Sequence, residues 1–104
     1  MINGYKKAGT YSYMAPEVLT GTLTVKSDIW SAGVLMMLLM TGHNPFRGFN
    51  QDETIRFVKN KVVNFQQACF KNLTICAKEL LERMLHRNLH KRISAADALQ
   101  SSWF

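Results

Sequence analysis

The chain is poor in cysteine and in acidic residues, and these two shortages bear on its cellular compartment and on its partners. Its 104 residues include two cysteines and two prolines, and 7 acidic residues stand against 13 lysines and arginines. The spacing of Cys69 and Cys76 fits no zinc or redox motif. We therefore expect reduced thiols in a cytoplasmic or nuclear protein, and one domain at most at this length.

No hydrophobic run is long enough to cross a membrane. The longest covers residues 29–40 and is interrupted only by Ser31 and Gly33. At about 1.5 Å per residue it would span about 18 Å, whereas a bilayer core needs about 30 Å. Residues 1–7 also contain no apolar stretch like that of a signal peptide. We expect a buried helix and no membrane partner.

The net charge of +6 admits nucleic acid as a partner, but the basic residues are scattered along the chain. Only Arg87, Lys91 and Arg92 form a cluster. A solvated basic face is the preferred interpretation. A basic helical domain that binds nucleic acid stays as a disfavoured alternative.

The sequence pattern predicts helices and no sheet, because no Asn-Gly or Asp-Gly turn joins two alternating apolar runs. A central helix is expected over residues 28–41, beginning near Ser27 or Asp28 and ending at Gly42. Later helices are expected at about residues 50–60, 74–86 and 94–100. Capping boxes are expected at Asn50 with Glu53 and at Ser94 with Asp97. Leu99, Trp103 and Phe104 are expected to seal the C-terminal end.

The expected central helix is apolar nearly all round its circumference. Such a helix needs neighbours on every side. The other expected helices are few, and each is apolar on one face only, so they cannot enclose it. The 104 residues are therefore interpreted as a piece of a larger domain whose core they do not complete.

Several sequence blocks in a fixed order point to one family. They are residues 9–17 (Gly-Thr-Tyr-Ser-Tyr-Met-Ala-Pro-Glu), 18–21, 26–34, 42–46, 74–85, Arg92 and 94–104. Together, from Ala8 to Phe104, they resemble the C-terminal half of the large lobe of eukaryotic Ser/Thr protein kinases. Residues 8–17 resemble the end of the activation segment. Such kinases often carry a phosphorylated hydroxyl at the position of Lys6. Because lysine has no hydroxyl, the resemblance favours the calcium/calmodulin-regulated or calcium-dependent groups, which often lack one at this position.

The resemblance implies an all-α chain that forms the C-terminal helical part of an α+β kinase catalytic domain. Four main helices would be arranged around a central apolar helix. Residues 1–104 would be a partial kinase domain from which the N-lobe and the catalytic loop are absent. The intact parent would use ATP and Mg²⁺ to phosphorylate Ser or Thr of protein substrates.

The resemblance also implies roles for named residues. Substrate-binding roles would fall to Gly9, Thr10, Tyr13, Met14 and Ala15. Thr10 would carry the Ser/Thr signature, and the last three would line the pocket for the residue after the phosphoacceptor. The alternative for Thr10 is a plain turn residue, and Tyr13 and Met14 can equally be core.

Glu17 and Arg92 would form a buried ion pair that anchors the substrate loop, since the arginine fork can bind a carboxylate through two hydrogen bonds. The alternative is a solvated Arg92. Asp28 would accept hydrogen bonds from the backbone of the catalytic loop. Its simpler role is that of an acid favouring a helix N-terminus.

No Gly-x-Gly-x-x-Gly, His-Arg-Asp or Asp-Phe-Gly occurs in these residues. We therefore expect no catalytic residue, no metal ligand and no cofactor in this chain, which would be inactive in isolation. Three functions remain open. The chain is a piece of a Ser/Thr kinase, with the protein substrate and the missing remainder of the domain as partners; or a non-catalytic kinase remnant acting as a binding module or scaffold; or the nucleic-acid-binding domain.

Overall fold

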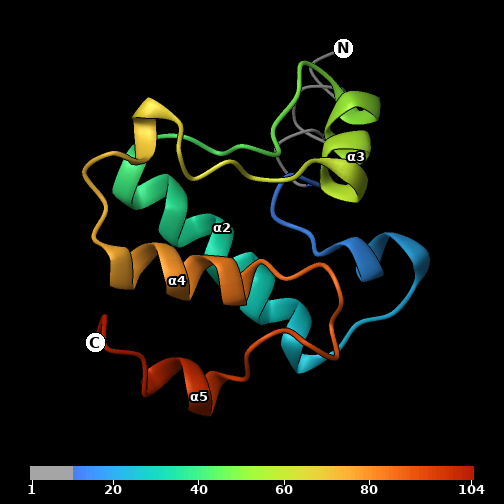
Figure 1. The fold of residues 1–104 in the computed structure, drawn as a ribbon. Helices are drawn as coiled ribbons and strands as arrows, with labels where there is room; N and C mark the ends of the chain where they lie inside the picture. The colour runs from blue at the N-terminus through green and yellow to red at the C-terminus, as the bar shows by residue number, and fades with distance from the viewer. Residues whose placement is uncertain (1–10) are drawn as a thin grey trace.

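A computed structural model describes residues 11–104, and its regular elements in that range are all helical (Figure 1). The elements are the 3-10 helix η1 (Pro16–Thr20), α2 (Val25–Thr41), α3 (Gln51–Asn60), the 3-10 helix η2 (Ala68–Phe70), α4 (Ile75–Met84) and α5 (Ala95–Leu99). This confirms the all-helical prediction for the part of the chain described. None of these helices combines the length and hydropathy needed to cross a bilayer.

Helix α2 begins at Val25, three residues before the predicted start. Its N-cap is Thr24, whose Oγ1 accepts a hydrogen bond from the backbone N of Lys26 at 3.1 Å. In return, Ser27 Oγ accepts one from the backbone N of Thr24 at 3.1 Å. This reciprocal pair satisfies N–H groups that the first turn of a helix leaves free. The acid at position 28 marks the first turn of α2, but this pair determines where the helix begins.

Side-chain caps also start the later helices. Asn50 Oδ1 accepts a hydrogen bond from the backbone N of Glu53 at 2.9 Å, as predicted. The other half of that capping box differs, because Glu53 Oε1 accepts from the backbone N of Phe49 at 2.8 Å. Ser94 Oγ accepts from the backbone N of Asp97 at 3.1 Å and starts α5. The sequence therefore located both caps correctly, but the reciprocal bond of each predicted capping box, from the backbone N of Asn50 or of Ser94, is not formed within residues 11–104.

The C-terminal residues do not form the predicted seal. Leu99 and Phe104 are each 67% exposed. Trp103 packs edge-on against Phe104, with ring centroids 4.8 Å apart, rather than into the core. Helix α5 ends at Leu99 and buries only Ala98, so it offers these side chains no apolar surface to cover. The prediction that Leu99, Trp103 and Phe104 cover the C-terminal end of the core is therefore wrong.

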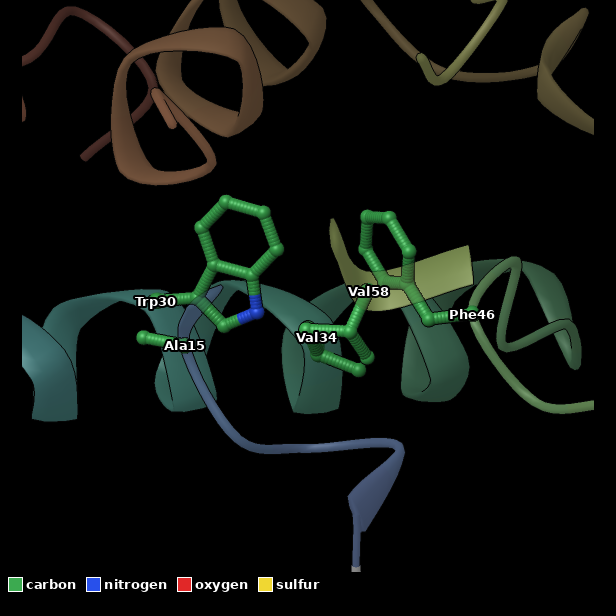
Figure 2. Close-up of a cluster of buried hydrophobic side chains, with 5 residues drawn as sticks. All are labelled: Ala15, Trp30, Val34, Phe46 and Val58. Atoms are coloured by element: carbon green, nitrogen blue, oxygen red, sulfur yellow. The ribbon is translucent and has the colours of Figure 1, made fainter. Parts of the chain in front are cut away.

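The core lies where α2 meets α4 and the loops beside them. One cluster consists of Ala15, Trp30, Val34, Phe46 and Val58 (Figure 2). Two further clusters lie along α4, whose buried residues are Ala77, Leu80, Leu81 and Met84. Gly33 allows α2 to approach α4 closely. A Cβ atom there would lie 3.1 Å from Met84 Cβ.

Helix α2 buries one face and exposes the opposite one. The buried residues are Ser27, Trp30, Gly33, Val34 and Met37. On the other side, Val25 is 82% exposed, Leu35 47% and Leu39 77%. At 3.6 residues per turn these three positions, together with Asp28 and Ala32, lie along one line of the helix. We call these five residues the exposed stripe of α2. The other helices of residues 11–104 do not cover it, as predicted.

Candidate functional site

The segment before α2 is fastened to that helix. Ala15 is the N-cap of η1, Pro16 is its first residue, and Gly21 ends it with φ +97°. That φ lies in the left-handed region, which favours glycine. Ser31 Oγ, on α2, donates a hydrogen bond to the Tyr13 carbonyl oxygen at 2.6 Å. The loop is therefore fixed against the middle of the chain's longest described helix.

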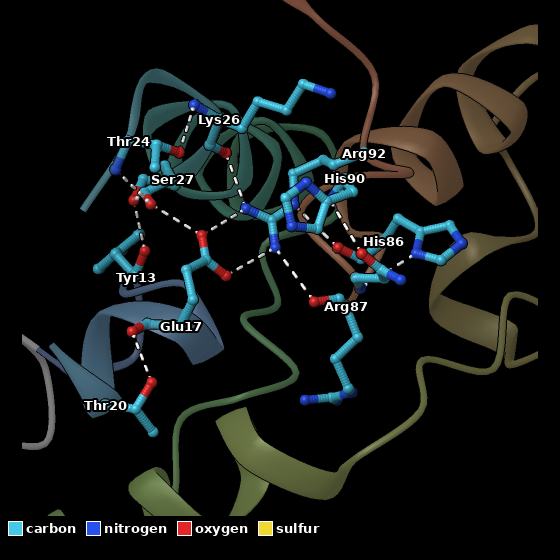
Figure 3. A network of polar contacts seen from close by, with 12 residues as sticks. Tyr13, Glu17, Thr20, Thr24, Lys26, Ser27, His86, Arg87, His90 and Arg92 are labelled. Atoms are coloured by element: carbon cyan, nitrogen blue, oxygen red, sulfur yellow. Dashed lines mark hydrogen bonds and ion pairs between the residues drawn. The ribbon is translucent and has the colours of Figure 1, made fainter. Parts of the chain in front are cut away.

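A bidentate ion pair joins η1 to the loop after α4. Arg92 Nη1 lies 2.7 Å from Glu17 Oε2, and Arg92 Nη2 lies 2.9 Å from Glu17 Oε1 (Figure 3). The two residues are 75 positions apart. Arg92 is 1% exposed, so this is not a solvated arginine. The structure thus brings together the two residues for which the resemblance implied a pair.

The pair is surrounded by groups that satisfy its remaining hydrogen-bonding capacity. Arg92 donates from Nε to the His86 carbonyl oxygen and from Nη1 to the Lys26 carbonyl oxygen, each at 2.8 Å. Ser27 Oγ donates to Glu17 Oε2 at 2.8 Å. Buried charges are tolerated when they are paired and hydrogen-bonded in this way. Glu17 and Arg92 therefore tie three separate segments together.

The guanidinium of Arg92 also lies over the ring of Trp30, 5.2 Å from its centre. Neither Trp30 nor Ser27 was predicted as a partner of the pair. Both lie on the buried face of α2, three positions apart, which is the spacing that places two side chains side by side on a helix. The spacing could have shown from the sequence that Ser27 and Trp30 share one face of α2. It does not show that this face contacts Glu17 and Arg92.

The surroundings of Glu17 set its acidity. Burial on its own raises the pKa of the Glu17 carboxyl. The hydrogen bonds from Arg92 and Ser27, helped by the positive charge of Arg92, outweigh burial and hold the pKa below its ordinary value of 4.5. The carboxylate form is therefore the one that the fold stabilises.

We expect acid to weaken the fold through Glu17. Its pKa is lower when folded than when unfolded, so its contribution is fully present above the unfolded-state pKa and is lost as the pH falls through the folded-state value. The measurement is the free energy of unfolding in urea from about pH 7 to about pH 3, for the protein and for Glu17→Gln. The gap between the two should narrow towards acid. A gap independent of pH would contradict the expectation.

The predicted substrate-binding residues lie in different surroundings. Tyr13 is half-buried and lines an open cavity of about 480 Å³ with Leu38 and Phe49. Met14 is also half-buried. Ala15 is fully buried in the Trp30 cluster, so its methyl group packs the core and does not line a surface pocket. Gly9 and Thr10 lie outside the described residues.

Asp28 lies apart from these residues, on the exposed stripe of α2. Its side chain is exposed and has no hydrogen bond or ion pair with any other of residues 11–104. Within the same range no group of His, Cys, Asp and Glu could hold a metal ion. The structure therefore joins Glu17 to Arg92 but does not join Asp28 to either.

The basic cluster is only partly the solvated face that the sequence suggested. Lys91 is exposed, but Arg92 is buried and Arg87 is half-buried. The Arg87 guanidinium donates to the carbonyl oxygens of Val58 and Lys61. These carbonyls lie at the C-terminal end of α3, where a helix leaves its C=O groups free and favours a cation. The bonds span 29 and 26 positions, so no local pattern announced them.

Comparison with known proteins identifies the family. Residues 3–104 match the family described as the protein kinase domain. The chain is 43% identical, over 98 residues, to calcium-dependent protein kinase 3 of Plasmodium yoelii yoelii. The aligned residues make up 94% of this chain and 18% of that protein. It is 38% identical, over 96 residues, to serine/threonine-protein kinase PEPKR2 of Arabidopsis thaliana, with 92% and 20% covered.

The structure is similar to that of a twitchin kinase fragment from C. elegans, described as autoregulated protein kinase and immunoglobulin domains. The TM-score is 0.85 at 34% identity, and the match covers 91% of this chain and 22% of that one. The chain thus spans about a fifth of the length of these relatives. Family match, sequence relatives and shared helical fold agree with the resemblance in the sequence blocks. The chain belongs to the eukaryotic Ser/Thr protein kinase family, and its helices are those of the C-terminal lobe of the kinase fold.

Proposed function

We propose that the chain supplies the substrate-docking loop and the helical core of a larger, intracellular Ser/Thr protein kinase domain. The observation that carries this proposal is the exposed stripe of α2, where Leu39 is 77% exposed and Val25 82%. Several large apolar side chains exposed along one face of a helix usually mark a site that another part of a protein covers. The remainder of the kinase domain is the occupant that the family membership favours.

Asp28 fits such a cover. It places a carboxylate among the apolar residues of the exposed stripe, without a partner in residues 11–104. Backbone N–H groups of a catalytic loop lying across α2 would give it charge-assisted hydrogen bonds. The Asp28 carboxylate would then keep hydrogen-bond partners when the rest of the domain buries the exposed stripe.

ATP and Mg²⁺ in the parent would be bound outside the described residues. Phosphoryl transfer in kinases needs a glycine-rich loop, a lysine on a strand, and aspartates for the substrate hydroxyl and the metal. None of the corresponding motifs occurs in the 104 residues. The contribution of this chain is therefore positioning. The ion pair of Glu17 with Arg92 holds η1 and the loop before it against α2.

The protein substrate would dock in the cavity beside Tyr13. Its apolar wall includes Leu38 and Phe49, and Arg47 and Glu53 place opposite charges on its lining. An extended peptide would insert an apolar side chain there, beside a lining that carries both Arg47 and Glu53. Thr10, which would contribute the Ser/Thr preference, precedes this cavity in the sequence.

The exposed stripe provides the test. We expect Leu39→Lys to leave the helical circular-dichroism signal of the isolated 104-residue chain nearly unchanged, because the side chain is already in water. In the complete kinase polypeptide the same change should lower the free energy of unfolding by at least about 2 kcal/mol, since it would bury an unpaired charge. Ile75→Lys is the matched control, because Ile75 is 75% exposed and lies on α4.

A small effect of Leu39→Lys in both the isolated chain and the complete polypeptide would contradict the proposal, because the exposed stripe would then be uncovered in the complete kinase as well. A kinase assay completes the test. The complete polypeptide should transfer phosphate from ATP to a Ser or Thr peptide, and the isolated chain should not. A cooperative melt of the isolated chain, without binding of an apolar dye, would instead support the non-catalytic binding module. The comparisons do not favour the nucleic-acid alternative.

A further inference from the structure

A second cavity, of about 430 Å³, lies between Trp30, the segment after α3 and the C-terminal end of α4. It shares no lining residue with the cavity beside Tyr13. Its walls are mainly apolar and include Trp30, Phe46, Val63, Phe65 and Leu85. This volume and lining fall within the range of small-molecule sites, which are concave and mostly apolar with a few placed polar groups.

The polar groups of the cavity are mainly basic. Arg87 and Lys61 line it, with Glu82 as the opposing charge. Arg87 is held in place by the Val58 and Lys61 carbonyl oxygens and by the Trp30 ring, whose centre lies 5.7 Å from its guanidinium carbon. Its side chain extends away from the Glu17–Arg92 pair (Figure 3).

Arg87 differs from Arg92 in forming no ion pair within the described part of the chain, although Glu82 lines the same cavity. Arg92 is neutralised by Glu17, whereas Arg87 has no ion pair with any of residues 11–104. Two carbonyl bonds leave further N–H donors of its guanidinium unused. Burial also lowers the pKa of Arg87, which reflects a cation removed from water without an anion to compensate. A ligand anion would supply the missing charge.

We propose that this cavity binds a small aromatic carboxylate, with its ring against Phe65 and its carboxylate on Arg87. A guanidinium fork matches a carboxylate in shape as well as in charge. An aromatic body suits walls that already contain aromatic rings. Glu82 opposes groups of higher negative charge, so a single carboxylate fits better than a phosphate. This site is independent of the proposed kinase role.

Three probes with the same ring system test the charge preference: indole-3-acetate, the neutral indole-3-acetamide and the cationic tryptamine. Binding is measured by isothermal titration calorimetry on the complete polypeptide that contains residues 1–104. We expect indole-3-acetate to bind at least about tenfold more tightly than either of the others, as a charge-assisted bond in a partly buried site allows. Equal affinities, or no binding of indole-3-acetate, would overturn the proposal.

Val62 gives a variant that spares the fold, because it lines the cavity and is 82% exposed. Val62→Asp should weaken binding of indole-3-acetate by about fivefold or more through repulsion, while Val62→Asn should change it by less than about twofold. Arg87→Met should abolish the preference for indole-3-acetate over indole-3-acetamide. Binding that is insensitive to Val62→Asp would place the ligand elsewhere and refute the site.

A peptide that ends in a free aromatic residue presents the same two groups as a free aromatic acid. Acetyl-Gly-Gly-Phe with a free carboxyl group, and its C-terminal amide as control, distinguish these sources. Competition with indole-3-acetate by the free acid alone would identify a peptide C-terminus as an accepted ligand. Absence of competition would restrict the cavity to small free acids.

Discussion

Replacing Arg92 by methionine is expected to lower the free energy of unfolding by about 3–5 kcal/mol, because the Glu17 carboxylate is then left buried without its partner. The Glu17 side chain is 10% exposed and that of Arg92 is 0% exposed, so water cannot replace the lost contacts. The carbonyl oxygens of His86 and Lys26 would lose their donor as well. The measurement is urea unfolding, with the slope of the transition checked for two-state behaviour.

Two single variants control for this result. Arg92→Lys keeps the charge but cannot form the two parallel bonds, so its loss should be intermediate. Lys91→Met removes a neighbouring exposed charge and should change stability by no more than about 0.5 kcal/mol. If Lys91→Met cost as much as Arg92→Met, overall charge and not the pair would be responsible.

The charge-swapped double variant separates pairing from simple burial. Glu17→Arg together with Arg92→Glu should be more stable than either single change, because the ion pair can form in reverse. It should remain less stable than the natural protein, since a carboxylate at position 92 cannot donate to the Lys26 and His86 carbonyl oxygens. A double variant no better folded than the single ones would remove the support for pairing.

Trp30→Ala is the second change with a large expected effect, a loss of about 3–5 kcal/mol. Trp30 is 1% exposed and packs against Phe46 with ring centroids 5.2 Å apart (Figure 2). The same ring lies beneath the guanidinium groups of Arg87 and Arg92. Its removal would therefore open a cavity and loosen the ion pair together. Thermal and urea unfolding measure the loss.

Trp30→Phe should lower the free energy of unfolding by less than its change in side-chain volume suggests. The indole Nε1 is buried and has no hydrogen-bond acceptor within residues 11–104, and phenylalanine removes that unpaired donor. Trp103→Ala is the control, because Trp103 lies at the less buried C-terminal end and is 37% exposed.

The connection between Trp30 and Arg92 can be measured directly. A double-mutant cycle with Trp30→Leu, which removes the aromatic ring, and Arg92→Met should give a coupling energy of about 0.5–3 kcal/mol, as expected for residues in contact. Strictly additive effects would show that the ring supports the core but not the ion pair.

Local signals in the sequence located most of the helices. Asn50 and Ser94 were recognised as caps because a capping side chain acts within three residues. The start of α2 was misplaced because the acid at position 28 and the Thr24–Ser27 pair both signal a helix start, and only the pair forms the cap. The exposed Trp103 was misjudged for a different reason. Burial of an apolar residue depends on whether a neighbouring surface exists, which local spacing does not specify.

The sequence by itself determined the family, the helical class and the excess of apolar surface on α2. Each family motif, helix cap and apolar repeat involves residues that are close together in the sequence, so each can be recognised without the fold. The sequence also suggested Glu17 with Arg92, but only through resemblance. The tertiary structure alone decided that Ser27, Trp30 and two backbone carbonyls complete that pair and that Arg87 turns to α3. Those contacts join residues up to 66 positions apart, and their geometry follows from how α2, α4 and the loops beside them pack.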